Sequence, residues 1–206
     1  IFGIFYAVLI SFFVMHVWAK FNSISSEISK QVNALKNVYI LSKQLSSHTL
    51  TQELKMILSN YTDEIVINLW NDKGNYEELN KKYLKLAYHF NDAHFETKAD
   101  EIVFSHLIGE INNSSIAQSN LINLITDKTP KILWILLLLL STVLIGSFIF
   151  LGFQNQLVAT ILITLVSAVT ALVVALIFDI DTPLQAGFWN ISSEPYRELK
   201  KFVQKN

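Results

Sequence analysis

Three long apolar runs dominate the pattern of hydrophobic and polar positions along the chain. They occupy residues 1–19, 132–153 and 157–178, and none of them contains a charged residue. Each approaches or exceeds the roughly 20 residues with which an α-helix crosses about 30 Å of hydrocarbon. Because the runs have no polar face, they are expected to lie in lipid rather than in a protein core. The pattern therefore predicts three transmembrane helices.

The rest of the chain has helical periodicity. From residue 20 to Leu45 apolar residues recur every three or four positions, so the first span should continue as an arm about 40 Å long. Further helices are expected near 50–70, 76–95 and 98–125, and no segment alternates with period two. The predicted fold is an all-α membrane protein. Its expected layout is a transmembrane helix at 1–19, a helical domain at 20–129, transmembrane helices at 131–153 and 157–178, and a turn with an amphipathic tail at 179–206.

The distribution of charge predicts an orientation. All 16 Lys and Arg residues lie outside the apolar runs, whereas the turn at 154–156 is uncharged. By the positive-inside rule, the helical domain should face the cytoplasm, and the chain should cross the membrane several times. Trp18 and Trp134 are expected as anchors at that interface. Ile1 is not a methionine and already lies in an apolar run, so we expect a fourth span upstream.

Composition and motifs narrow the possible chemistry. The net charge is -1 and there is no cysteine, so we expect no nucleic-acid partner and no thiolate metal site. Phosphate-binding loops and hydrolase motifs are missing, and we therefore expect neither enzymatic activity nor a cofactor. The densest group of metal-ligand residue types matches no known spacing, and a solvated helix face explains it more simply than a metal site. That group is His89, Asp92, His94 and Glu96.

One face of the first span has the composition of a pore constriction. Phe5, Leu9, Phe12 and His16 share this face, which is expected to continue as a polar vestibule through Ser23 and Glu27. Hydrophobic rings gate ion pores by dewetting, so an oligomer built around this helix could conduct ions. Contact between these side chains and lipid is an equally good interpretation of the same pattern.

The last two spans carry small residues along one side. Such residues let helices approach closely in lipid, so we expect them to mark helix contacts rather than the lining of a pore. The helix-packing candidates are Thr142, Gly146, Thr164, Ser167, Ala171 and Ala175.

Two acids follow directly on the last span. Asp179 and Asp181 lie near a helix C-terminus, where the macrodipole disfavours negative charge, and Pro183 and Gly187 complete a turn motif. The carboxylates therefore need a partner. The pattern leaves open a Lys or Arg, a set of backbone donors, or a cation such as Ca²⁺. We favour a structural turn without a metal.

Several of these positions together give the chain a resemblance to a known family. They are Trp18, Phe21, Glu27, residues 33–35, Tyr61, Trp70, Trp134, residues 181–184 and residues 192–195. The chain resembles the bestrophin-like domain-of-unknown-function family of bacterial membrane proteins. It departs from that family's pattern at Leu184 and Ala186, where Phe and Gly are usual. The resemblance implies four spans and a ring of subunits around a central anion pore, with Phe5, Leu9 and Phe12 as its neck.

Two functional hypotheses follow from these observations. The first is a homo-oligomeric channel in the lipid bilayer that conducts small inorganic anions such as chloride and is gated by the helical domain. The second is a non-conducting membrane scaffold or sensor that binds a cytoplasmic partner. Ion flux through a bilayer, or its absence, separates the two.

Overall fold

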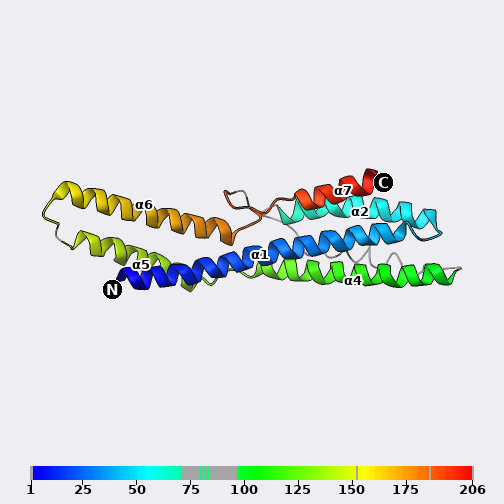
Figure 1. Ribbon diagram of the computed structural model, residues 1–206, viewed down its shortest axis with the longest axis horizontal. Coiled ribbons are helices and arrows are strands. Elements are labelled where there is room, and N and C mark those ends of the chain that lie inside the picture. The colour runs from blue at the N-terminus through cyan, green and yellow to red at the C-terminus, as the bar shows by residue number, and fades with distance from the viewer. Residues whose placement is uncertain are drawn as a thin grey trace. The chain divides into compact units, whose positions relative to one another are not determined.

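The computed structural model describes residues 2–70, 79, 81, 83, 97–151, 153–185 and 187–205. No described residue is in a β-strand, which confirms the predicted all-α class. The predicted helix near 76–95, with its His and acidic residues, lies largely outside the described residues. The helices labelled in Figure 1 are α1 (Phe2–Ser42), α2 (His48–Leu69), α4 (Lys98–Thr126), α5 (Lys131–Ile149), α6 (Gln156–Asp181) and α7 (Glu194–Lys205).

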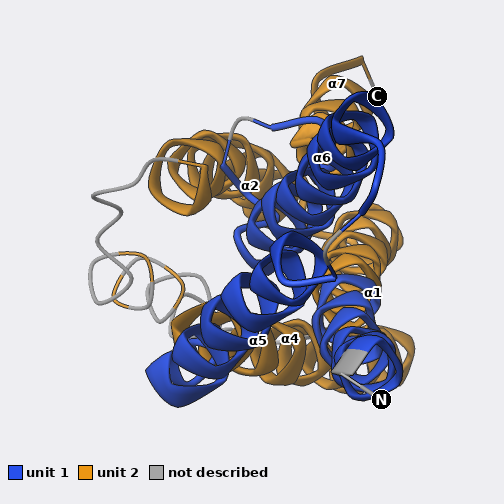
Figure 2. Cartoon of the chain, turned by 90° about the vertical axis from the view of Figure 1, so that its left-hand side faces the viewer, with its two compact units in different colours: residues 1–22, 127–190 blue, residues 23–126, 191–206 orange. Residues whose placement is uncertain are grey.

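The chain divides into two compact units, which Figure 2 distinguishes by colour. The first, here called the membrane unit, consists of residues 1–22 and 127–190. The second, the helical unit, consists of residues 23–126 and 191–206. Helix α1 contributes to both, because it runs for 41 residues without a break. The expected continuation of the first span into an arm is therefore observed.

The membrane unit contains the helices α5 and α6 and the first half of α1. All three helices are long and apolar enough to cross a membrane. A hydroxyl pair, Tyr6 and Ser141, joins α1 to α5 at 3.0 Å. Between α5 and α6, the Asn155 side chain caps the start of α6 by accepting from the Leu157 N–H at 3.0 Å. The buried core of this unit is Tyr6, Phe13, Val17, Leu137, Ile177 and Ile180.

The helical unit closes around a buried core of its own. Helices α1, α2, α4 and α7 each contribute apolar side chains at three- and four-residue spacing, as expected of amphipathic helices. Fully buried examples are Leu35 on α1, Leu58 and Ile65 on α2, and Leu107 on α4. This core is formed within one chain.

A buried polar chain runs through this core. The Tyr196 hydroxyl of α7 donates to Gln31 Oε1 on α1, and Gln31 Nε2 donates to the Tyr61 hydroxyl of α2 at 3.1 Å. Tyr61 in turn donates to Gln118 Oε1 on α4 at 2.6 Å. Burial raises the pKa of both tyrosines, so they remain protonated donors. The network joins four helices through neutral hydrogen bonds.

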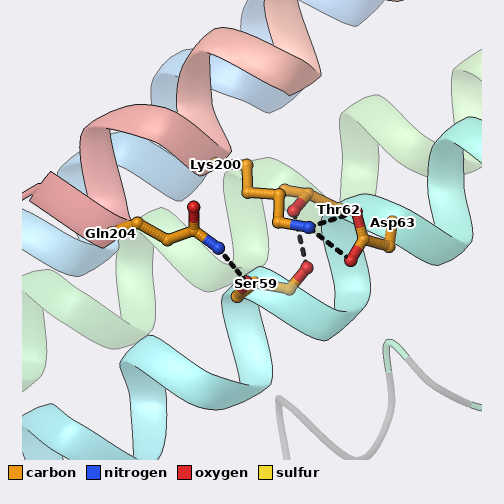
Figure 3. A network of polar contacts seen from close by, with 5 residues as sticks. All are labelled: Ser59, Thr62, Asp63, Lys200 and Gln204. Atoms are coloured by element: carbon orange, nitrogen blue, oxygen red, sulfur yellow. Dashed lines mark hydrogen bonds and ion pairs between the residues drawn. The ribbon is translucent and has the colours of Figure 1, made fainter.

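The tail helix α7 packs along α2. Its buried face is Tyr196, Leu199 and Val203, in agreement with an amphipathic tail. On the surface, Lys200 Nζ lies 2.6 Å from Asp63 Oδ2, and Gln204 donates to the Ser59 hydroxyl at 3.3 Å (Figure 3). The apolar face of the tail helix is therefore covered by α2 of the helical unit.

Candidate functional site

The pore-lining candidates all fall on one strip of α1. Phe5 and Phe12 are 65% and 67% exposed, His16 is exposed, and Leu9 is half-buried between them. On the neighbouring face, Tyr6, Phe13 and Val17 are at most 7% exposed, because α5 and α6 cover them. The membrane unit thus packs one side of its first span and leaves the aromatic side uncovered.

Beyond the membrane unit, α1 differs from the expected vestibule at one residue. Ser23 and Ser26 are exposed, but Glu27 is only 8% exposed. The carboxylate of Glu27 lies 2.7 Å from Lys30 Nζ and accepts from Asn120 of α4 at 3.4 Å. Glu27 therefore belongs to the contact between α1 and α4, and the expectation that it continues the open face is wrong. No carboxylate occurs on α1 before it.

The two acids at the end of α6 have partners within the membrane unit. Asp181 Oδ1 accepts from the Thr129 hydroxyl at 2.6 Å and lies 3.4 Å from Lys20 Nζ. The Lys20 and Asp181 side chains are 11% and 13% exposed, so this ion pair is largely shielded from water. Asp179 Oδ2 accepts from the Trp189 backbone N–H at 2.7 Å. Of the partners left open by the sequence, a lysine and a backbone donor are thus both present.

Gly187 lies close to the Asp179 side chain in this turn. A Cβ at this position would overlap the carboxylate of Asp179, so a larger residue fits only if that side chain moves. Pro183 is buried at the start of the turn. The four residues of the predicted turn motif therefore lie in one arrangement that also includes Lys20 and Thr129. The sequence pattern did not single out Lys20 or Thr129. It did indicate that an acid near a helix C-terminus needs a partner, and Lys20 is a cation of the kind expected.

Aromatic rings surround the same end of the three spans. The Trp134 ring lies 5.3 Å from that of Phe13 and 6.0 Å from that of Phe178, both in edge-on geometry. Trp18 makes a similar contact with Trp189 at 5.9 Å. Indole rings are enriched at membrane–water interfaces, so these contacts suit the anchoring role expected for Trp18 and Trp134.

The small residues of α5 and α6 do not form the contact between these helices. Thr142, Thr164, Ala171 and Ala175 are exposed, and nothing lies within 4 Å of a Cβ built at Gly146. Ser167, Ala171 and Ala175 instead line an apolar groove of about 1100 Å³. The buried positions of the pair are Leu137, Ser141, Thr170, Ile177 and Ile180. A packing role for the small residues therefore remains a prediction.

Potential metal ligands are scattered among the described residues. Among the described residues, no three His, Cys, Asp or Glu side chains are grouped so that they could hold a metal ion. The group around His89 lies outside the described residues. The acids of the turn are held by a lysine, a hydroxyl and a backbone N–H.

The fold and the exposed face of α1 define an all-helical integral membrane protein whose first span continues into a helical unit. The chain belongs to the Bestrophin-like family, since the profile of the Bestrophin-like domain matches residues 1–196. The resemblance seen in the sequence is thereby confirmed. No curated protein matches the chain.

Solved structures agree with this assignment at the level of the fold. A point mutant of a bacterial bestrophin homologue from Klebsiella pneumoniae superposes with a TM-score of 0.82 at 10% identity, covering 99% of this chain and 84% of that one. A second mutant of the homologue gives 0.81 at 11% identity with the same coverage. A crystal structure described as that of a membrane protein gives 0.78 at 10% identity, again covering 99% and 84%.

Proposed function

We propose that the protein is a homo-oligomeric ion channel whose pore is lined by Phe5, Leu9, Phe12 and His16. The observation that carries the proposal is the exposure of the aromatic strip of α1 beside a face that α5 and α6 bury. Copies arranged around an axis would bring these strips together as stacked rings. The known members of the Bestrophin-like family are ion channels, which supports this use of the strip.

The conducted ions are proposed to be small inorganic anions such as chloride. Rings of Asp or Glu favour cations, and α1 carries no carboxylate from Phe2 to Ser26. Phenyl rings form a narrow apolar constriction that excludes water when it is tight. The exposed hydroxyls of Ser23 and Ser26 follow on the same helix and can solvate an ion that has passed the apolar constriction.

The helical unit is proposed to face the cytoplasm of a bacterial inner membrane and to gate the pore. Gating is supported by the continuity of α1, because a movement of its second half is carried into the span by an unbroken helix. The cysteine-free chain allows a direct test of orientation. In intact cells an impermeant thiol reagent should label Gln154→Cys, in the turn between α5 and α6, but should label Lys98→Cys only after lysis.

Conduction is tested with the full chain reconstituted in liposomes. Chloride flux is expected for the wild type, and the double substitution Phe5→Ala, Phe12→Ala should change its rate several-fold. Phe150→Ala is the control, because Phe150 is a 90% exposed phenylalanine at the end of α5 and does not belong to the strip on α1. The control should conduct as the wild type does. Sodium flux measured in parallel reports selectivity.

Two results would overturn parts of this proposal. Equal flux and gating in the wild type and the double variant would show that the strip does not form the neck. If the wild type shows no ion flux and is a monomer in nanodiscs, the channel hypothesis is wrong and the scaffold hypothesis is favoured. Mass measurement of the assembly in nanodiscs gives the number of subunits in the same preparation.

A further inference from the structure

A polar groove of about 630 Å³ lies in the helical unit where the end of α1, the first turns of α2 and the end of α7 come together. Its size is within the range of about 300–1,000 Å³ typical of small-molecule sites. Among the described residues that line it, Lys43, His48 and Lys55 are basic and none is acidic. The groove therefore concentrates positive charge in a chain whose net charge is only -1.

Two of the basic side chains make contacts within the groove. Lys55 Nζ donates to the Gln204 backbone carbonyl at 3.1 Å, which fixes the ammonium beside the end of α7. An ammonium has three donors, so this bond leaves it others for a ligand. Lys43 Nζ lies 5.9 Å from the centre of the Tyr39 ring on the α1 wall. The cations thus come from two different walls of one groove.

The positive charge of the groove comes from its side chains and not from the helix ends that meet there. Helix α2 begins at His48, runs for 22 residues and has no acidic residue in its first turn. The N-terminal end of a helix macrodipole is equivalent to roughly half a positive charge, but the C-terminal ends of α1 and α7 at the same groove carry the opposite partial charge. The Asp100 carboxylate, which accepts from the Ser46 N–H at 3.1 Å, also lies close to the start of α2. A compact polyanion fits these surroundings better than a single chloride, because several separated donors can each bind one of its oxygens.

We propose that this groove binds a small phosphate-bearing polyanion through Lys43, Lys55 and His48. The proposal is independent of conduction, because the binding is a property of the helical unit. The shared chemistry is the phosphate group, carried either by a soluble metabolite or by a lipid headgroup.

Isothermal titration calorimetry of the full chain in nanodiscs of neutral lipid, with inorganic tripolyphosphate as the probe, tests the proposal. Saturable binding is expected at near-physiological salt. The double variant Lys43→Gln, Lys55→Gln should lose at least tenfold in affinity, whereas Lys43→Arg, Lys55→Arg should retain most of it. The matched control Lys98→Gln, Lys128→Gln removes the same charge from exposed positions outside the groove and should bind as the wild type does.

The outcomes separate the site from general electrostatic attraction. The absence of saturable binding, or an equal loss in the groove and control variants, would overturn the proposal. The His48→Gln variant gives a second measurement that leaves the contact between Lys55 and α7 intact, and it should weaken binding as well. A short-chain phosphatidylglycerol titrated in place of tripolyphosphate distinguishes the sources. If phosphatidylglycerol binds more tightly than tripolyphosphate and loses affinity in the groove variants, the ligand is a lipid headgroup. If tripolyphosphate binds more tightly, the ligand is a soluble phosphate compound.

Discussion

The membrane unit and the helical unit bury their apolar residues to very different extents. In the most apolar 18-residue windows of α5 and α6, only 11% of residues are buried. In the helical unit, α2 alone buries Leu54, Leu58, Ile65 and Leu69. A surface as apolar as that of α5 and α6 is unfavourable in water, so lipid or other chains must cover it. The helical unit buries a core of its own within a single chain, although Ile67 and Ile102 remain exposed on its surface.

Polar groups show the same contrast. The helical unit buries a chain of neutral hydrogen bonds from Tyr196 to Gln118 in the middle of its core. The membrane unit gathers its ionic groups at helix ends, where Lys20 and Thr129 hold Asp181. This separation is expected where hydrocarbon surrounds the helices, because a charge in mid-bilayer is costly. The two units are therefore built for different solvents.

The largest expected effect comes from truncating a core residue of the helical unit. Leu58 is fully buried, so Leu58→Ala should cost about 2–5 kcal/mol through lost burial and a residual cavity. Leu165, on α6, is 59% exposed, and Leu165→Ala should change stability little in the protein as isolated. Thermal unfolding in detergent, followed by circular dichroism, measures both. Similar losses for the two variants would show that Leu165 is covered in the assembly.

The turn of the membrane unit should be the next most sensitive position. Gly187→Ala places a Cβ against the Asp179 carboxylate and should cost about 1–3 kcal/mol, typical of overpacking. Gly146→Ala meets no atom within 4 Å, and in a helix this change should be neutral or stabilising by about 0.5–1 kcal/mol. The difference in unfolding temperature between the variants checks the prediction. If both variants melt together, Gly187 is not required by the turn.

Hydropathy sufficed to predict the class of fold and the three spans, because each run is long and uncharged. The need of Asp179 and Asp181 for partners also followed from their place at a helix end. Their identities did not, since Thr129 and Lys20 lie 52 and 161 residues from Asp181 in sequence. Glu27 was misplaced for a similar reason. Helical spacing put it on the open face, whereas a partner on α4, Asn120, determines where its carboxylate lies.

Acid should weaken the helical unit through Asp100. Hydrogen bonds from the Thr97 hydroxyl and the Ser46 backbone N–H hold the pKa of Asp100 below its ordinary value of 3.8. A carboxyl with a depressed pKa stabilises the fold above its ordinary pKa, and this contribution is lost as pH falls through the folded value. Asp100→Asn should therefore lower the unfolding temperature at pH 7, and the difference should close toward pH 3. If the difference in unfolding temperature between the wild type and Asp100→Asn does not change with pH, the effect does not come from the ionisation of Asp100.

The smallest expected effects come from the ion pairs, and they sharpen the contrast between the units. Lys200 and Asp63 are 31% and 51% exposed, so a double-mutant cycle should give only about 0.2–1 kcal/mol of coupling. Because Lys20 and Asp181 are far less exposed, their coupling should be larger and should fall less when salt is raised. The cycles use Lys→Met and Asp→Asn in both pairs, with unfolding measured at low and high salt. Equal couplings with the same salt dependence would mean that the end of α6 is as well solvated as the surface of α7.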